Sequence, residues 1–395
     1  MKKLLSMGLL LMMVALLSGC SSAANYYKEG KKNFIKEDYD KAAVNFSKAI
    51  IKNPNRGDYY IDYGLALTAL GNYEEALKQF DKAYVDKDLS VIQKNNKRLF
   101  RGRGIVYYNM QNYDKAIAEF NNALLVSKSP SLDRDILYYM GSSLKIIGSY
   151  EEALKTYTEI LTGKGKKAQA YADRGYCYRK MGMMDQSLAD YDSAILLEPN
   201  NYEYYFGKYY LLLEDFNDKG KAKEVLAQAG DIKAETEEDK YNQAKLHYYQ
   251  ENYDVALSEL ESSFNSGFYE AYYYIGEIYQ MNKDYSKAIY YYDKLIDTEK
   301  VSVSNVYNQA AVCLMKTGDY KKAAKYLEKG ILFQDSGTLQ VLKKNEIIVY
   351  ELLGEFKTAE EKMGEYLAKY PQDKDALREA EFIKTRTMNA VTREQ

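Results

Sequence analysis

A small or apolar residue recurs along this chain, and the residues around it keep fixed distances from it. These anchor positions, separated by 32 to 40 residues apart from one gap of 69, are Gly30, Gly64, Gly104, Gly141, Gly175, Ala244, Gly276, Ala311 and Ile347. Positions −4, 0 and +3 from an anchor share one face of a helix, and positions +9, +12, +16 and +19 share one face of a second helix. The pattern therefore predicts one pair of helices for each anchor.

The second helix of each predicted pair carries three recurrent positions. Position +9 is aromatic in all copies except Met184: Tyr39, Tyr73, Tyr113, Tyr150, Tyr253, Tyr285, Tyr320 and Phe356. Position +12 is small: Ala42, Ala76, Ala116, Ala153, Ser187, Ala256, Ala288, Ala323 and Ala359. Position +16 is large: Phe46, Phe80, Phe120, Tyr157, Tyr191, Leu260, Tyr292, Leu327 and Met363. We expect the small residues to let the two helices approach closely, with the large residue filling the space beside them.

Glycine and proline mark the connections between the predicted helices. Glycines that favour a left-handed helix end lie between the two helices of a pair, at Gly71, Gly148, Gly182, Gly318 and Gly354. All four prolines, Pro54, Pro130, Pro199 and Pro371, fall between pairs, where no helical N–H is required. A weaker copy over residues 201–226 fits only if two residues are inserted around Asn217 to Gly220.

These offsets resemble the tetratricopeptide repeat, and the resemblance covers roughly residues 23–373. It implies an all-α fold, a right-handed α-solenoid of about ten helix–turn–helix repeats whose first helices line an inner groove. Five repeats are expected over 23–200, a divergent repeat over 201–236 and repeats seven to ten over 237–373. Residues 374–395 are expected to form a capping helix and tail, with Leu377, Ala380 and Ile383 as its apolar stripe. The early Trp of the family is absent here.

In such a groove, positions −3, +1 and +4 are expected to face a partner. Tyrosine and arginine are frequent there, and both are enriched at binding hot spots. The candidate groove residues are Tyr27, Lys31, Arg101, Tyr108, Tyr138, Lys145, Tyr176, Arg179, Tyr205, Tyr209, Tyr241, Lys245, Tyr248 and Tyr273. Because the chain contains 43 tyrosines, its overall composition is the alternative explanation of this enrichment.

The first twenty residues resemble a bacterial lipoprotein signal. Lys2 and Lys3 precede an apolar run from Leu4 to Leu17, which ends in Leu-Ser-Gly-Cys at Cys20. The run is too short to span a bilayer comfortably. The resemblance implies that residues 1–19 are removed, that Cys20 is acylated, and that residues 20–22 form a short tether. We therefore expect a lipid-anchored protein on the cell membrane or outer membrane, facing away from the cytoplasm. An ordinary signal peptide with a chance Cys is the alternative.

Composition leaves little material for catalysis or for nucleic-acid binding. The formal net charge is −2, which gives no electrostatic reason to expect a nucleic acid as ligand. The only histidine, His247, falls at a core-facing position, and Cys177 and Cys313 fall at equivalent positions that predict buried free thiols. The run Glu235 to Asp239 is typical of a helix start. We expect no enzyme activity, no metal and no cofactor.

The sequence thus predicts a scaffold of the cell envelope that binds a protein or peptide in its groove. Envelope or secretion-complex assembly is the setting that the resemblance permits. A surface that binds glycan or peptidoglycan through its tyrosines is the second hypothesis. The clamp by which some members of the family bind chaperone C termini is not matched, because Arg101 is followed by Ile105 where the clamp has Asn.

We predict that Cys20→Ser prevents lipid attachment, because the thiol is the acceptor of the lipid. The variant should be released from membranes or remain unprocessed, as measured by membrane fractionation and metabolic labelling with a radioactive fatty acid. A lipid-labelled, processed variant in the membrane fraction would show that the lipoprotein hypothesis is wrong.

Overall fold

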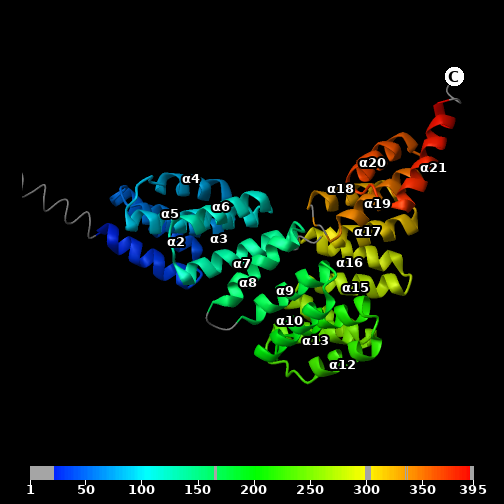
Figure 1. Ribbon diagram of the computed structural model, residues 1–395, viewed down its shortest axis with the longest axis horizontal. Helices are drawn as coiled ribbons and strands as arrows, with labels where there is room; N and C mark the ends of the chain where they lie inside the picture. The colour runs from blue at the N-terminus through cyan, green and yellow to red at the C-terminus, as the bar shows by residue number, and fades with distance from the viewer. Residues whose placement is uncertain (1–21, 164–166, 299–303, 334, 336, 392–395) are drawn as a thin grey trace, which may run out of the picture. The chain divides into compact units, whose positions relative to one another are not determined.

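The computed structural model describes residues 22–163, 167–298, 304–333, 335 and 337–391, and these contain helices and no strands (Figure 1). The predicted signal segment and Cys20 lie outside the described residues. Within the described part, no helix combines the length and apolar character needed to cross a membrane. The chain divides into two compact units, one ending at residue 165 but without 146–148, and one comprising 146–148 and 166 onward.

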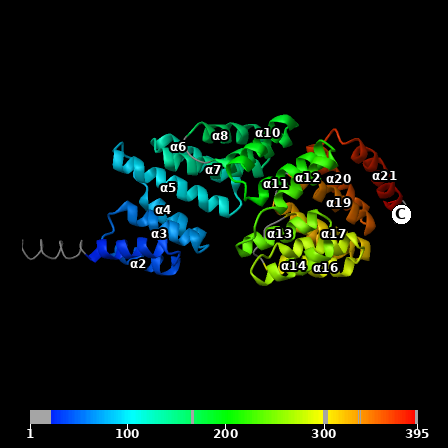
Figure 2. The same ribbon diagram turned by 90° about the horizontal axis from the view of Figure 1, so that it is seen from below.

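The first unit is a series of paired helices. Residues 22–35 are helical and pair with the first labelled helix, and consecutive helices then lie side by side (Figures 1 and 2). The labelled helices are α2 (Tyr39–Lys52), α3 (Gly57–Ala69), α4 (Tyr73–Ala83), α5 (Ser90–Asn109), α6 (Tyr113–Val126), α7 (Pro130–Ile146) and α8 (Tyr150–Thr162).

The second unit continues the same arrangement. Its helices are α9 (Ala168–Lys180), α10 (Met184–Leu197), α11 (Tyr202–Tyr210), the π-helix η1 (Leu211–Asp215), α12 (Lys219–Gly230), α13 (Glu237–Tyr249), α14 (Tyr253–Asn265), α15 (Ala271–Met281), α16 (Tyr285–Asp297), α17 (Ser304–Thr317), α18 (Tyr320–Leu332), α19 (Leu339–Leu352), α20 (Phe356–Lys369) and α21 (Lys374–Val391). The described helices therefore form ten consecutive pairs followed by α21, which confirms the predicted all-α fold.

The turn inside each pair has the same backbone conformation whether or not it contains glycine. The five predicted glycines all have positive φ, from 74° at Gly182 to 86° at Gly318. At the same offset of +7 from the anchor, Glu37, Gln111, Glu251 and Lys283 also have φ near 60°. The left-handed residue lets the chain reverse directly into the second helix. An acidic or amide side chain often caps that helix, as when Asp284 accepts a hydrogen bond from the backbone N–H of Lys287.

Five of the six anchor glycines, all except Gly175, make room for the aromatic ring at +16 of their own pair. A Cβ added at Gly30 would lie 2.6 Å from the ring of Phe46, and one at Gly141 would lie 2.9 Å from the ring of Tyr157. Contacts this short do not occur between real Cβ atoms and their neighbours. The rings themselves are fully or almost fully buried. The small anchor thus accommodates a ring, and the expected close helix approach follows from that fit.

The divergent pair departs from the others in helix geometry. The expected insertion near Asn217 is accompanied by a wider turn over Leu211–Asp215, where the N–H of Phe216 donates to the carbonyl of Leu211 at 3.1 Å. A π-helical turn accommodates an additional residue without breaking the helix. Gly207 packs against Tyr191 of the preceding pair as Gly102 packs against Phe80. This equivalence shifts the phase of the copy by one residue from the predicted one.

The final helix α21 covers the end of the second unit. Ile383 and Ala376 are buried in a cluster with Met363 of α20, whereas Leu377 of the predicted stripe remains 46% exposed. Near this contact, Glu351 of α19 and Glu379 of α21 line one small cavity of about 190 Å³. Burial, together with the nearby carboxyl of Glu379, raises the pKa of Glu351 to about 7.

We predict opposite effects of alanine at two helical glycines of the second unit. Gly276→Ala should lower the free energy of unfolding by about 1–3 kcal/mol, because its Cβ would meet the ring of Tyr292 at 2.5 Å. Gly364→Ala, whose Cβ would meet nothing within 4 Å, should raise it by about 0.5–1 kcal/mol through the better helix propensity of alanine. Urea unfolding measures both, and equal effects would refute the assigned packing.

We also predict that the Glu351 carboxyl makes the C-terminal contact sensitive to pH. Because its pKa is raised in the folded chain, the folded state retains a proton that the unfolded state loses, so stability should fall as pH rises from about 5 to about 8. Glu351→Gln should reduce this dependence in urea unfolding, whereas Glu381→Gln, on an exposed position of α21, should not. An unchanged pH dependence in Glu351→Gln would contradict the assignment.

Candidate partner-binding site

The predicted groove residues of the first unit bond to the first helix of the next pair. The hydroxyl of Tyr27 donates to Asp62 at 2.5 Å, and Arg101 forms an ion pair with Asp135. Tyr108 shares a hydrogen bond of 3.0 Å with Ser142 on α7. These side chains therefore link neighbouring helix pairs within the protein itself.

The other predicted residues of this unit are Lys31, Tyr138 and Lys145. The ammonium of Lys31 lies 4.7 Å from the ring centre of Tyr27, and Lys31 lines a small apolar cavity of about 260 Å³ with Phe34 and Leu65. Tyr138 and Lys145 are half-buried on α7. None of these contacts gathers several predicted groove residues around one cavity.

In the second unit, four of the predicted residues come together on α13 and α15. They are Tyr241, Lys245, Tyr248 and Tyr273. The remaining ones lie apart from this group: the half-buried Tyr176 contacts Lys180, Arg179 binds Glu214 and Asp215 of the π-helix, and Tyr209 lines a different cavity with α12. Tyr205 is only 6% exposed and its hydroxyl donates to the carbonyl of Pro199. The phase shift of its copy places Tyr205 in the core rather than on the groove.

An aromatic cluster supports the group on α13 and α15. Tyr248 and Tyr274 have ring centres 5.1 Å apart, and the hydroxyls of Tyr249 and Tyr274 lie 3.3 Å apart. Tyr210 of α11 joins the cluster through Tyr249 at 5.5 Å. Burial raises the pKa of Tyr210 to about 12 and raises that of Tyr249 well above its ordinary value. The cluster is therefore uncharged at neutral pH and holds three first helices together.

Lys245 is buried within this aromatic surface. It is 7% exposed, and its ammonium lies 4.8 Å from the ring centre of Phe206 and 5.6 Å from that of Tyr241. Its ion-pair partner is Glu203 of α11, whose side chain is 60% exposed. A buried ammonium requires such compensation, and aromatic faces and a carboxylate supply it.

A cavity of about 710 Å³ opens beside Lys245, and we call it the α13 cavity. It lies between the starts of α11, α13 and α15, with one residue from α9. Its lining combines aromatic, acidic and amide side chains: Gln169, Asn200, Asn201, Tyr202, Glu203, Glu238, Asp239, Tyr241, Asn242, Lys245, Phe268, Glu270 and Tyr274. Its volume falls in the range of roughly 300–1,000 Å³ typical of ligand sites.

A neighbouring cavity of about 380 Å³ contains the carboxylate of Glu277. The hydroxyls of Tyr248 and Tyr273 donate to its two oxygens at 2.9 and 2.7 Å. Burial raises the pKa of Glu277, and the two hydroxyls oppose that shift. Asn305 of α17 donates to the Tyr273 hydroxyl at 2.6 Å. Predicted groove residues thus hold this carboxylate in place by hydrogen bonds.

Sequence reasoning missed the acidic part of the site. Glu238 and Glu270 both lie six residues before an anchor, as Asp58 and Asp135 do in the first unit. Position −6 was not among the offsets expected to face a partner. A comparison of this offset between copies would have found all four carboxylates.

The polar groups outside the cavities have structural roles. His247 Nδ1 lies 2.6 Å from Glu259 on the adjacent helix, and Cys177 and Cys313 are buried thiols that form no disulfide, as predicted. Burial raises the pKa of Cys313 to about 12, which keeps it protonated. Within the described part of the chain, no three His, Cys, Asp or Glu side chains are placed to hold a metal ion. The aromatic, acidic and amide side chains of the α13 cavity can contact a ligand through apolar surface, charge and hydrogen bonds.

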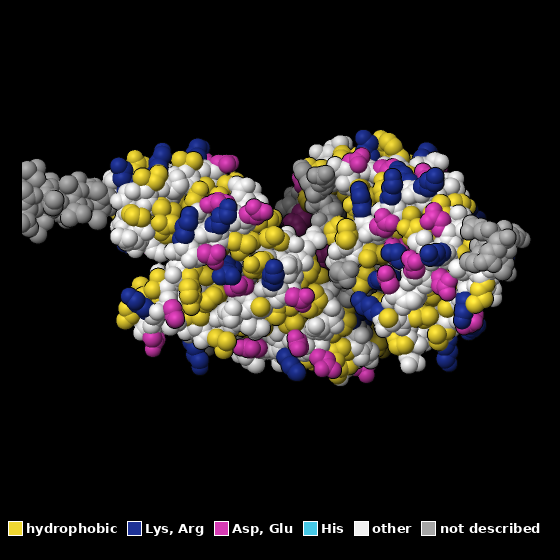
Figure 3. All heavy atoms as spheres, turned by 90° about the horizontal axis from the view of Figure 1, so that it is seen from above, with side chains coloured by type: hydrophobic (Ala, Val, Ile, Leu, Met, Phe, Trp, Pro, Cys, Tyr) yellow, Lys and Arg dark blue, Asp and Glu magenta, His cyan; other side chains and the backbone are white. Residues whose placement is uncertain are grey.

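Basic and acidic side chains are interspersed over the face drawn in Figure 3. Neither sign forms a broad field on that face. A nucleic-acid-binding surface is typically a continuous basic patch. The α13 cavity differs from this mixed surface because carboxylates predominate among the charged side chains of its lining.

Known proteins similar to this chain share its repeats. The Hsp70-Hsp90 organizing protein of Triticum aestivum is 24% identical over 207 residues, which are 45% of this chain and 36% of that protein. The corresponding protein 1 of Glycine max is 25% identical over 43% of this chain and 35% of its own length. This chain therefore spans about a third of the length of these curated relatives.

Among solved structures, a tetratricopeptide repeat protein from Parabacteroides merdae is 17% identical, with a TM-score of 0.44 over 64% of this chain and 98% of that one. YrrB, described as a TPR protein with an unusual peptide-binding site, is 23% identical, with a TM-score of 0.40 over 48% of this chain and 92% of its own. Profiles of the tetratricopeptide repeat match residues 36–89, 101–173 and 241–300, residues 168–201, and residues 304–334, which together are more than half of the chain. The chain belongs to the tetratricopeptide repeat family.

Proposed function

We propose that this protein is a lipid-anchored scaffold of the cell envelope that binds a protein or peptide partner at the α13 cavity. The observation that carries the binding part is the cavity itself, in which aromatic walls, carboxylates and amides from several first helices surround about 710 Å³. A few placed polar groups on an aromatic surface are typical of sites that recognise a specific ligand. The anchoring part rests on the signal-like segment that ends at Cys20.

The site is held in position before a partner arrives. Tyr274, Tyr249 and Tyr210 join the helices behind the cavity, and Lys245 bonds α13 to Glu203 of α11. Binding to a preformed surface avoids the entropy cost of ordering that surface. The rigid tyrosines supply contact area, while the exposed carboxylates at the rim supply specificity.

A peptide suits this cavity better than a glycan does. Sugars stack on open aromatic faces, but here the ring of Tyr241 stacks on Phe268 with centres 5.0 Å apart. The ammonium of Lys245 lies over the ring of Tyr274. The faces that a sugar would use are thus already engaged. Glycan or peptidoglycan binding is therefore the second candidate.

The names of the curated relatives refer to Hsp70 and Hsp90, but we do not extend that partner to this chain. The chain resembles them over about a third of their length. At the position where the chaperone-binding clamp of the family has Asn, this chain has Ile105. The proposed partner is accordingly a protein of the cell envelope.

The test is photocrosslinking in cells that produce the full-length chain. A photoreactive residue at Asn242, which lines the α13 cavity, should give a protein adduct in the membrane fraction. The same residue at Glu361, on an exposed position of α20, serves as the matched control and should not give that adduct.

Two treatments of the adduct separate the candidate functions. Protease sensitivity of the attached material would identify a polypeptide partner. An adduct that disappears after muramidase and resists protease would replace the proposal with glycan binding. Equal adducts at Asn242 and Glu361 would contradict a specific site at the cavity.

A further inference from the structure

We infer that the α13 cavity binds a basic segment of a polypeptide, whose lysine or arginine side chains meet Glu238 and Glu270. This inference rests on the proposed function and specifies the chemistry of the partner. Some charges of the cavity are neutralised by ion pairs within the protein, and others are not. The inference follows from this difference and from the kind of side chain that the cavity walls can contact.

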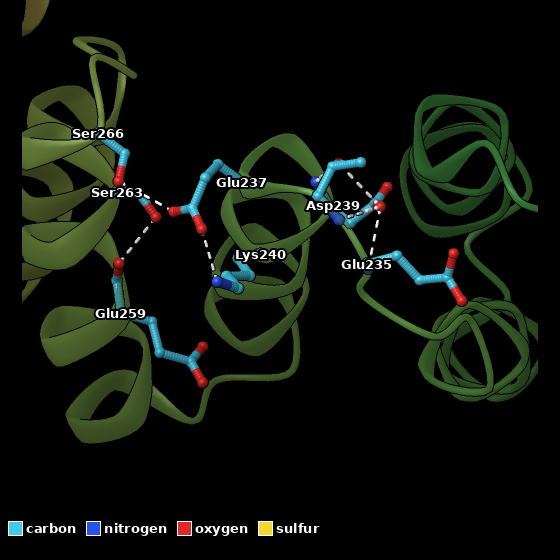
Figure 4. A network of polar contacts seen from close by, with 8 residues as sticks. Glu235, Glu237, Asp239, Lys240, Glu259, Ser263 and Ser266 are labelled. Carbon is cyan, nitrogen blue, oxygen red and sulfur yellow. Dashed lines mark hydrogen bonds and ion pairs between the residues drawn. The ribbon is translucent and has the colours of Figure 1, made fainter.

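The acidic start of α13 is divided between structural and unused carboxylates. Asp239 turns back to Thr236, accepting from its backbone N–H at 2.9 Å and its hydroxyl at 2.8 Å (Figure 4). Glu237 points toward Ser266, which follows the end of α14, and pairs with Lys240. Glu238 has neither role. The helix start therefore accounts for Asp239 and Glu237 but leaves Glu238 for the cavity.

The lining as a whole is strongly negative. It contains four carboxylates, those of Glu203, Glu238, Asp239 and Glu270, and one ammonium, that of Lys245, for a net charge of −3. Glu203 is paired with Lys245. Glu238 and Glu270 are exposed and form no ion pair with any described residue. Two carboxylates that face a cavity and have no cation as their own partner favour a cationic ligand.

Lys245 does not make the cavity a site for an anion. Its ammonium is enclosed by the rings of Phe206, Tyr241 and Tyr274 and is bound to Glu203. A ligand carboxylate would have to displace Glu203 and then sit among the remaining carboxylates of the rim. Like charges in such proximity oppose binding. A peptide C terminus is therefore the disfavoured ligand.

The walls fit the remainder of a basic side chain and its backbone. Tyr241, Phe268 and Tyr274 line the cavity with aromatic surface that the long aliphatic stem of lysine or arginine can contact without stacking on a ring face. Asn200, Asn201 and Asn242 offer amide groups, which can both donate to and accept from a peptide backbone. A volume of about 710 Å³ accommodates more than one side chain. These features favour a polypeptide over a small polyamine.

The test uses the full chain and a short fluorescent peptide that alternates lysine with tyrosine, followed by fluorescence anisotropy. Its counterpart with glutamate in place of lysine, and unlabelled spermidine as competitor, are the comparison ligands. The variant Glu238→Gln/Glu270→Gln removes the two unpaired charges. Glu361→Gln/Glu381→Gln, at exposed positions of α20 and α21, removes the same charge from the same unit and is the matched control.

We expect the lysine peptide to bind wild type and the control variant equally, and to bind the cavity variant roughly tenfold more weakly or worse, a loss of about 1.4 kcal/mol. Its affinity for wild type should also fall as salt rises. Equal binding of lysine and glutamate peptides, or equal weakening in both variants, would overturn the inference, as would spermidine competing as well as the unlabelled peptide.

These outcomes are separate from those of the proposed function. Absence of binding to every peptide would also overturn the basic-ligand inference. In that case an adduct at Asn242 in cells would still support a protein partner of other chemistry. If the Asn242 position gave no adduct in cells but the chain still bound the lysine peptide, the scaffold role would be contradicted. The preference of the cavity for a basic ligand would remain supported.

Discussion

The fit of one aromatic ring over one glycine anchor is the constraint on which five of the described helix pairs depend. In these pairs, whose anchors are Gly30, Gly64, Gly104, Gly141 and Gly276, the ring at +16 occupies the place of the missing side chain, as Phe80 does beside Gly64. Gly102 shows the same ring being received by the next pair. One residue type thus fixes the packing within a pair and between successive pairs, which is how a repeat protein builds a continuous core from local contacts.

Most of the fold could be predicted from the sequence because this fit repeats. A glycine and a ring sixteen residues apart identify a pair without knowledge of distant contacts. The left-handed turns at Gly71 and Gly354 could be predicted because glycine adopts positive φ readily. The turns at Glu37 and Gln111 could not be predicted from residue type, because residues with side chains rarely adopt positive φ. Repetition of the offset, rather than residue type, is what reveals them.

The candidate site could be predicted only in part. The offsets identified Tyr241, Lys245, Tyr248 and Tyr273, which the structure brings together on α13 and α15. The same offsets placed Tyr205 on the groove. The repeat that contains Tyr205 lacks a clear anchor residue and includes a π-helical turn, so its true phase differs from the predicted one by one residue. The ion pair of Arg101 with Asp135 depends on two neighbouring pairs, and a pattern within one pair does not contain it.

Many side chains of the first helices therefore bond neighbouring helix pairs to each other. At the α13 cavity, exposed carboxylates that have no ion-pair partner are available to bind a ligand. Hydrogen exchange on the full chain, with and without the lysine–tyrosine peptide at low salt, tests this claim most directly. The account predicts slower exchange in fragments covering residues 237–249 and 268–281, with the fragments of α2 to α8 unchanged. Slower exchange confined to other helices, or none at all, would contradict it.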